Sequence, residues 1–284
     1  MNIRRKPDWL RISRTSAGDY SLVNSLVKDG CLHTICQSGK CPNQAECWSR
    51  GTATFMLLGD ICTRNCKFCA TITGRPLPPD SEEPEKLAFS VKAMRLKHVV
   101  LTSVTRDDLP DQGAEHWRRC VESIKDACKD TTVEILTPDF CQRRELIEQV
   151  AKAKPDIFSH NLETVERLTP VIRSKATYRG SLRTLEIMHE LGFTTKTGIM
   201  LGLGETEEEI CQTMDDALAV GVSIFTMGQY LQPSTKHYPV AEYVTPQRFA
   251  EYKKIALAKG FQYVESAPLV RSSYHAEEAL GRNE

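Results

Sequence analysis

The sequence of 284 residues predicts an α/β protein, specifically a partial (β/α)6 barrel of the TIM type. Three observations support this class: short apolar β-branched runs, amphipathic stretches of helical length, and their strict alternation with a repeat of about 25 to 45 residues. This alternation is typical of a parallel sheet with right-handed crossovers. Six units precede Gln229, which is too few to close an eight-stranded barrel.

Each strand is expected where β-branched and apolar residues cluster between polar ones, namely at 53–58, 98–104, 132–136, 156–160, 197–201 and 223–227. Helices are expected where apolar residues recur three or four positions apart, at 82–94, 114–129, 142–153, 178–191 and 206–220. In barrels of this kind the carboxyl ends of the strands carry the chemistry. The polar residues that follow each predicted strand are therefore candidates for a site.

Three regions are expected along the chain. Residues 1–50 are polar and irregular, and they form an N-terminal extension that carries four cysteines. Residues 51–232 contain the β/α units of the partial barrel. Residues 233–284 form a C-terminal segment. We expect the extension and the segment after Tyr230 to cover the open side of the barrel.

Charge and hydropathy exclude several classes of function. Lys and Arg total 37 and Asp and Glu total 37, so the formal charge is zero and nothing favours a nucleic-acid surface. Apolar runs stay well short of the roughly 18 residues that a membrane span needs. The N-terminus lacks the apolar stretch of an export signal. We therefore expect a cytoplasmic protein with neither nucleic acid nor membrane as a partner.

The 11 cysteines are the most informative residues. They make up about 4% of the chain, below the 8 to 10% that marks a disulfide scaffold, and a reducing compartment disfavours disulfides. Four are scattered and are expected to pack as small apolar residues: Cys120, Cys128, Cys141 and Cys211. Seven lie close together and are expected to include metal ligands: Cys31, Cys36, Cys41, Cys47, Cys62, Cys66 and Cys69.

The second cysteine triplet in the chain has the spacing C-x3-C-x2-C, at Cys62, Cys66 and Cys69, just after the first predicted strand. A 4Fe-4S cluster takes one ligand per iron, so three thiolates leave one iron open to a small molecule. The alternative is a zinc site, but zinc favours paired C-x2-C units that complete four ligands.

The first triplet has the spacing C-x4-C-x5-C, at Cys36, Cys41 and Cys47. It lies in the irregular extension, which buries little apolar surface of its own, so a bound cluster would order it. Cys31 is the nearest candidate for a fourth ligand. A zinc knuckle or free thiols remain alternatives for this triplet.

Several stretches together resemble the lipoyl synthase family. The C-x3-C-x2-C triplet, with Phe68 before its last cysteine, is similar to the motif of the wider radical S-adenosylmethionine (SAM) superfamily. The paired triplets and Arg-Ser-Ser-Tyr at 271–274 resemble lipoyl synthases specifically. Further similar stretches lie at 6–11, 51–56, 101–110, 160–164, 202–205 and 228–233. Two departures, Gln-Ser-Gly-Lys at 37–40 and Gln112 where the family more often has glycine, remove no ligand.

The resemblance implies a sulfurtransferase with two 4Fe-4S clusters. Cys62, Cys66 and Cys69 would hold the cluster that binds and cleaves SAM. Cys36, Cys41, Cys47 and the hydroxyl of Ser273, in place of Cys31, would hold an auxiliary cluster that supplies sulfur. The product would be the lipoyl group, made by inserting sulfur at C6 and C8 of an octanoyl chain attached to a lysine.

The partners implied are an octanoylated lipoyl carrier domain or glycine cleavage H protein, an electron donor such as ferredoxin or flavodoxin, and an iron-sulfur carrier. The enzyme itself is expected to be a monomer.

The superfamily resemblance also suggests which residues contact SAM. They follow the later predicted strands and comprise Asn161, Glu163, Arg173, Gly202, Glu205 and Met227. An arginine fork suits the SAM carboxylate. The alternative for each is a structural residue at the barrel rim, and Met227 also fits a core position.

Two competing functions fit parts of the sequence. Another radical SAM sulfurtransferase would act on a biotin precursor or on RNA, but an RNA enzyme would favour a basic patch or an added domain. An iron-sulfur electron carrier or redox sensor would favour two fully ligated clusters and would need less scaffold than a six-unit barrel.

Overall fold

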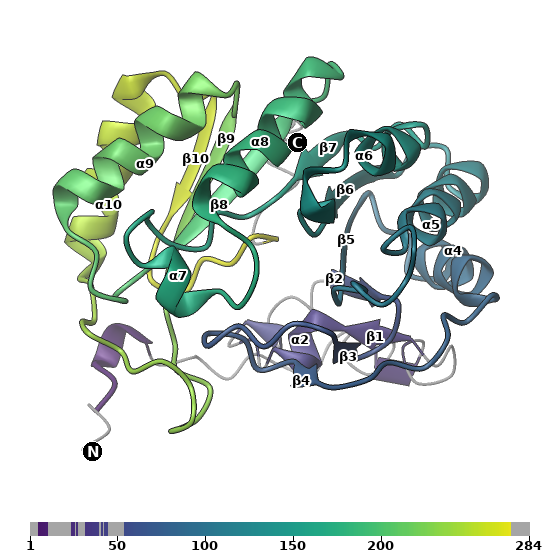
Figure 1. Cartoon of the computed structure of the whole chain (residues 1–284), viewed down its shortest axis with the longest axis horizontal. Helices are drawn as coiled ribbons and strands as arrows, with labels where there is room; N and C mark the ends of the chain where they lie inside the picture. The colour runs from purple at the N-terminus through teal and green to yellow at the C-terminus, as the bar shows by residue number, and fades with distance from the viewer. Residues whose placement is uncertain are drawn as a thin grey trace. The chain divides into compact units, whose positions relative to one another are not determined.

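The computed structural model describes residues 5–10, 24, 25, 27, 32–39, 41, 43, 44 and 54–273. Contacts between Cα atoms divide the chain into two compact units. The N unit comprises Ile12–Arg64 and Ala70–Phe158. The C unit comprises Met1–Arg11, Asn65–Cys69 and Ser159–Glu284. Figure 1 labels the helices and strands of both.

The N unit is built on a mainly parallel sheet. Its strands are β1 (His33–Thr34), β2 (Thr54–Leu57), β5 (His98–Ser103) and β6 (Thr132–Leu136), in that order. β2, β5 and β6 run parallel, whereas β1 lies antiparallel on β2 and so occupies that edge of the sheet. β3 (Ile61–Cys62) and β4 (Ile72–Thr73) form a separate parallel pair. β7 (Ile157–Ser159) lies where the chain leaves this unit.

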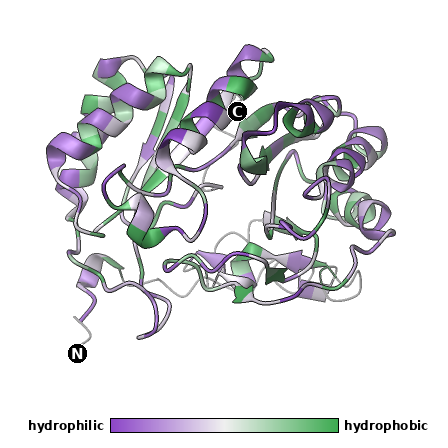
Figure 2. Ribbon diagram, in the orientation of Figure 1, coloured by the Kyte–Doolittle hydropathy of each residue, from purple (hydrophilic) through white to green (hydrophobic). Residues whose placement is uncertain are grey.

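Three helices cover one side of this sheet: α4 (Glu83–Ala93), α5 (Ala114–Ala127) and α6 (Arg144–Ala151). On α5 the buried side chains recur three or four positions apart, which is the pattern of a helix with one face toward a core. Hydrophilic residues lie on the outward sides of these helices (Figure 2). The first five residues of β5 are buried, as expected for a central parallel strand.

The C unit repeats the same plan. β8 (Thr195–Leu201), β9 (Ile224–Gln229) and β10 (Tyr263–Ser266) form a parallel sheet in that order. Its helices are α7 (Thr169–Ile172), α8 (Tyr178–Glu190), α9 (Glu207–Ala219) and α10 (Pro246–Lys259). The hydroxyl of Thr206 and the carboxylate of Glu209 form a capping box that fixes the start of α9.

The predicted α/β class is confirmed, because every predicted strand and helix has a counterpart close to its expected range. The segment after Tyr230 adds α10 and β10, which extend the β/α series beyond the six predicted units. The sequence analysis also missed β1, the β3–β4 pair, α7 and three short helical turns: η1 (Asp8–Leu10), α2 (Ile35–Ser38) and η2 (Phe140–Gln142). Within the part of the chain that the structure describes, no helix is long and apolar enough to cross a membrane.

The departure at Gln112 has a visible backbone consequence. Gln112 has a φ of 50°, in the left-handed region that favours glycine, and Gly113 follows with a φ of 84°. The position therefore has the geometry of a glycine although its side chain is larger.

The added α10 should be part of the folded core. Phe249 on α10 is completely buried, and its carbonyl accepts a hydrogen bond from Ser266 Oγ of β10 at 2.8 Å. Phe249→Ala should lower the free energy of unfolding by about 3 to 5 kcal/mol, because it leaves a cavity. Leu257→Ala, at a position 45% exposed on the same helix, should change it by less than about 0.5 kcal/mol. Urea titration of the two metal-free variants measures both, and equal small effects would mean that α10 is only peripheral.

Candidate functional site

Cys62 ends β3 in the N unit, and its sulfur accepts two backbone hydrogen bonds. The donors are the N–H groups of Arg64 at 3.4 Å and Thr105 at 3.3 Å. Thr63 ties the same loop to the segment after β5, since its N–H and its hydroxyl both donate to the Thr105 carbonyl. Hydrogen bonds to sulfur are among the features that tune an iron-sulfur site, and here they fix the position of the Cys62 sulfur.

Arg64, inside the cysteine motif, is held by two carboxylates, the half-buried one of Asp107 and the buried one of Asp139. Its guanidinium donates to both oxygens of Asp107 at 2.9 Å and lies 2.8 Å from an oxygen of Asp139. The Arg64 side chain is 6% exposed and that of Asp139 is 3% exposed. Asp107 follows β5 and Asp139 follows β6, so these ion pairs fasten the motif to the carboxyl ends of two strands.

Cys66 lies in the C unit, against the residues that follow α7. Its sulfur is 3.6 Å from the hydroxyl of Ser174, and that hydroxyl also accepts the N–H of Asn65 at 3.1 Å. The N–H of Lys67 donates to the carbonyl of Ile172 at 2.8 Å. The residue between these two anchors is Arg173.

Cys69 is held from the segment after β9. Its carbonyl lies 3.0 Å from Nε2 of His237, whose other ring nitrogen is 2.8 Å from the Ser234 hydroxyl. The N–H of Tyr238 donates to the carbonyl of Lys67 at 2.9 Å. The stretch 65–69 is thus hydrogen-bonded within its unit both to the residues around Arg173 and to the segment that contains His237 and Tyr238.

The structure brings three of the predicted cofactor contacts together at the start of the C unit. Arg173 Nη1 donates to the carbonyl of Asn161 at 3.1 Å and to the hydroxyl of Ser181 at 2.8 Å. Arg173 Nε is buried and has no hydrogen-bond partner among the described atoms. Burial raises the pKa of Glu163, against the opposing attraction of Arg173.

Glu163 has a strained backbone. Its φ is 69°, and β8 fixes it from both sides, because its N–H donates to Gly198 and its carbonyl accepts from Met200. No side chain fits at Gly198, where a Cβ would lie 2.2 Å from Thr226 Oγ1 and 3.4 Å from Asn161 Oδ1. The buried backbone of Gly198 therefore lies close against Thr226 and beside Asn161.

The predicted contacts Gly202 and Glu205 form one turn at the end of β8. Gly202 has a φ of 97°, and a Cβ there would lie 2.3 Å from the Glu242 carbonyl. The Glu205 carboxylate accepts the N–H groups of Gly202 and Leu203, so it holds the turn. Met227 lies fully buried on β9, in register with Ile199, which is a core position.

The first cysteine triplet is described only in part. Cys36 is buried on α2, and its carbonyl accepts the N–H of Cys41 at 3.0 Å. Cys47 and Cys31 lie outside the described residues. Ser273 is the last described residue and belongs to the C unit; its neighbour Ser272 accepts a hydrogen bond from Asn161 Nδ2 at 2.8 Å.

The sequence analysis missed the residues that anchor these loops. Asp107 and Asp139 follow predicted strands, which was a usable signal, but nothing indicated that both would face Arg64. Ser174 and His237 lie in loops with no motif of their own. Of the four scattered cysteines only Cys120 is fully buried, whereas Cys128, Cys141 and Cys211 are half-buried.

Comparison with known proteins gives three kinds of match. Residues 56–217 match the model of the Radical SAM superfamily. The lipoyl synthase of Parabacteroides distasonis is 58% identical over 97% of this chain and 98% of its own length. The lipoyl synthase of Treponema denticola is 54% identical over 96% of this chain and 94% of its own.

Solved structures show the same fold at low identity. The FeFe-hydrogenase maturase HydG of Carboxydothermus hydrogenoformans matches with a TM-score of 0.59 and 12% identity, over 92% of this chain and 76% of that chain. Methylornithine synthase (PylB) matches with a TM-score of 0.55 and 11% identity, over 90% and 87%. These matches confirm the partial barrel architecture.

Removing the Arg64 guanidinium should destabilise the N unit. Arg64→Ala leaves the buried carboxylate of Asp139 and the half-buried one of Asp107 without their cation, so the free energy of unfolding should fall by about 3 to 5 kcal/mol. Arg64→Lys keeps the charge but cannot form the bidentate pair, so its loss of unfolding free energy should be smaller than that of Arg64→Ala. Arg144→Ala removes a solvent-exposed arginine paired with Glu148 and should cost less than about 1 kcal/mol. Chemical denaturation of the metal-free proteins distinguishes the cases; equal losses in R64A and R144A would contradict the buried-pair argument.

Proposed function

The chain belongs to the lipoyl synthase family of the radical SAM superfamily, and on that premise we propose how its own residues serve the reaction. It is a radical SAM sulfurtransferase that inserts sulfur at C6 and C8 of a protein-bound octanoyl chain. It uses a 4Fe-4S cluster and SAM, and its substrate is an octanoylated acceptor protein.

This reaction needs a radical because the target carbons carry unactivated C–H bonds. The acidity of such bonds lies far outside the range that a protein can reach by tuning a side-chain base. When bound, SAM and its reduced cluster supply a 5'-deoxyadenosyl radical for hydrogen abstraction. The residues of the chain then have to bind, orient and shield these groups.

Cys62, Cys66 and Cys69 are the proposed ligands of the SAM cluster. The donor set fits an iron-sulfur cluster, because three thiols at this spacing leave one iron for a small ligand. Two N–H groups directed at Cys62 Sγ fix the position of that sulfur. The anchors of Arg64 and of residues 65–69 support a loop whose shape is set before the cluster binds.

Arg173 is the proposed partner of the SAM carboxylate. Its buried Nε has no hydrogen-bond partner among the described atoms, which leaves a donor for a bound group. Ile172 and Ser174, on either side of it, hydrogen-bond the stretch 65–69. Arg173 therefore lies next to the stretch that contains Cys66 and Cys69, and a charge-assisted bond from it to a carboxylate would be strong.

Asn161 and Glu163 are proposed to contact the ribose and the amino group of SAM. A cationic amino group would favour the ionised carboxylate that burial disfavours in Glu163. Gly202 and Glu205 are also proposed to contact SAM, at the rim. Glu205 holds the turn, and Gly202 lets the backbone come close to the Glu242 carbonyl. Met227 would support the adenine pocket from the core.

Cys36, Cys41, Cys47 and Ser273 are the proposed ligands of an auxiliary 4Fe-4S cluster that is the sulfur source. A serine oxygen is a harder ligand than a thiolate and suits iron-sulfur clusters less well. It is therefore a reasonable ligand for a cluster that has to open. The sulfur to be inserted would then belong to a cluster held by an N-terminal cysteine triplet and a C-terminal serine.

The proposed partners follow from the same reaction. The acceptor would be a lipoyl carrier domain or the glycine cleavage H protein, the reductant a ferredoxin or flavodoxin, and an iron-sulfur carrier would rebuild the auxiliary cluster. We propose that the enzyme acts as a monomer in the cytoplasm.

The test of the function is anaerobic reconstitution to about eight irons per chain, the content of two 4Fe-4S clusters. The protein is then incubated with SAM, a strong reductant and an octanoyl-lysine carrier domain. We expect 5'-deoxyadenosine together with a product heavier by two sulfurs, measured by mass spectrometry. A fully reconstituted protein that forms no 5'-deoxyadenosine would contradict the assignment.

Ser273→Ala should separate the two halves of the reaction. Cleavage of SAM should stay within about twofold of the unmodified enzyme, whereas formation of the doubly thiolated product should fall at least tenfold. Ser273→Cys restores a ligand and should recover iron content. Ser272→Ala is the neighbouring control and should leave the ratio of product to 5'-deoxyadenosine unchanged. Parallel loss of cleavage and sulfur transfer in S273A would remove Ser273 from the ligand set.

A further inference from the structure

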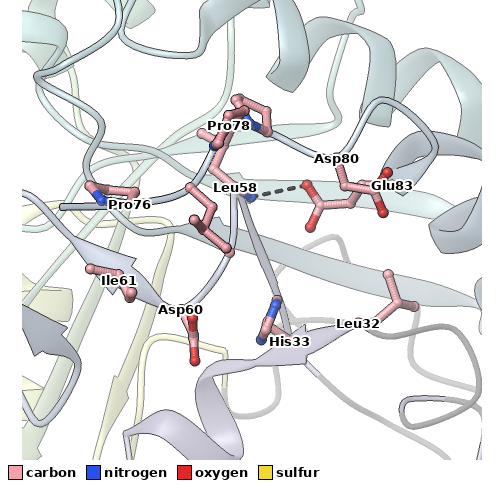
Figure 3. Close-up of a pocket in the computed structure, with 12 residues that line it drawn as sticks. Leu32, His33, Leu58, Asp60, Ile61, Pro76, Pro78, Asp80 and Glu83 are labelled. Atoms are coloured by element: carbon pink, nitrogen blue, oxygen red, sulfur yellow. Dashed lines mark hydrogen bonds between the residues drawn. The ribbon is translucent and has the colours of Figure 1, made fainter. Parts of the chain in front are cut away.

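The chain leaves β2 through a strained turn at Leu58 and Gly59. Leu58 has a φ of 68° and Gly59 a φ of 92°, although leucine rarely adopts the left-handed region. Leu58 is only 3% exposed, so its N–H needs a partner inside the protein. That partner is the carboxylate of Glu83, whose Oε2 accepts the N–H at 3.0 Å (Figure 3).

Glu83 is a buried carboxylate with a second donor. Its Oε2 lies 2.5 Å from Nε2 of His116, and both residues are less than 9% exposed. Glu83 begins α4 and His116 lies in the first turn of α5, so the pair joins these two helices at the turn. A buried carboxylate is tolerated when donors satisfy it, and here one oxygen atom serves both.

Gly113 holds the turn from another direction. A Cβ at Gly113 would lie 2.6 Å from Cδ1 of Leu58, so the leucine side chain occupies the space that glycine leaves. A cavity of about 170 Å³ borders the turn and is lined by Leu58, Gly59, Asp60 and Glu83 among others (Figure 3). The cavity leaves part of the turn without packing. The shape of the turn therefore depends on the Glu83 hydrogen bond and on the contact between Leu58 and Gly113.

The turn leads directly to the cysteine motif. Cys62 is four residues after Leu58, and all residues from Leu58 to Arg64 belong to the N unit. We propose that Glu83 and His116 are positioning residues: they hold the Leu58–Gly59 turn and thereby set where Cys62 presents its sulfur. This proposal rests on the assignment of Cys62 as a ligand of the SAM cluster, made above.

The same residues could instead be a metal site. Ligand atoms of Glu83, His116 and Cys120 lie within 4.8 Å of one another, and all three residues are buried. However, Glu83 Oε2 already accepts the backbone N–H of Leu58 and contacts His116 Nε2 directly, so this oxygen is satisfied without an ion. Burial also raises the pKa of the Cys120 thiol well above its ordinary value, which disfavours the thiolate that a metal needs. Positioning explains the contacts without a further group.

The first measurement uses the protein without clusters. In Glu83→Ala the amides of residues 57–63 should exchange with deuterium at least tenfold faster, while those of β8 stay unchanged. Gly113→Ala keeps the Glu83–His116 pair but crowds Leu58, and should give the same local acceleration. Glu85→Ala, an exposed glutamate of α4, is the matched control and should leave residues 57–63 unaffected.

The second measurement uses the reconstituted enzyme. E83A and G113A should both alter the electron paramagnetic resonance signal of the reduced SAM cluster, and both should form 5'-deoxyadenosine at least tenfold more slowly. Glu83→Gln keeps an acceptor for the Leu58 N–H and should recover most of the local protection. A change in thermal stability alone would not produce this pattern of rescue.

Three results would overturn the proposal. Faster exchange spread evenly over α4 and α5 in E83A would indicate only a fold-stabilising pair. A metal site would be established instead if the protein bound a metal other than iron and Cys120→Ala both lost that metal and changed the electron paramagnetic resonance signal as E83A does. Unchanged exchange at residues 57–63 in both E83A and G113A would show that neither contact holds the turn. If Cys62→Ala kept its full iron content, the ligand assignment would fail, independently of the exchange results.

Discussion

The position of the cysteine motif depends on the ion pairs that Arg64 forms with Asp107 and Asp139. Removing three charged groups from water is costly, and the attraction between them offsets that cost only when the geometry is good. Here the guanidinium binds Asp107 with two parallel hydrogen bonds, the strongest arrangement for this pair. The charges lie at the ends of β5 and β6, so the rigidity of the sheet is transmitted to a loop that has little packing of its own.

Each part of the motif is anchored within its own unit. In the N unit the anchors are Thr63 and Arg64, and in the C unit they are Ser174, His237 and Tyr238. A loop fixed in this way loses little conformational freedom when a ligand binds, which lowers the entropic cost of binding. Separately, the backbone N–H groups of Arg64 and Thr105 donate to the sulfur of Cys62, and such donors are among the features that tune an iron-sulfur centre.

The β/α framework was predictable from the sequence because burial on parallel strands and amphipathic helices leaves a periodic pattern. α10 and β10 were missed because an irregular stretch, 230–245, separates them from β9 and β10 has only four residues. The cysteine spacing predicted a cluster with one open iron, whereas resemblance and not spacing supplied Ser273 as a predicted ligand. The anchors could not be predicted, since Arg64 and Asp139, or Cys66 and Ser174, are brought together only by the folded chain. Glu163 shows the limit clearly, because its left-handed backbone is imposed by β8 and leaves no local signal.

The fit of Leu58 into the space above Gly113 makes these two positions epistatic. A methyl group at position 113 meets the leucine at once, whereas with a smaller residue at position 58 only the strain of the left-handed backbone at position 113 would remain. The order in which such substitutions arise therefore decides whether the intermediate survives, because one order passes through a clash and the other through a cavity, and clash and cavity differ in cost. Such pairs of positions change together in related sequences. Coupling between positions 58 and 113 would show that the path of the chain into the cysteine motif is constrained.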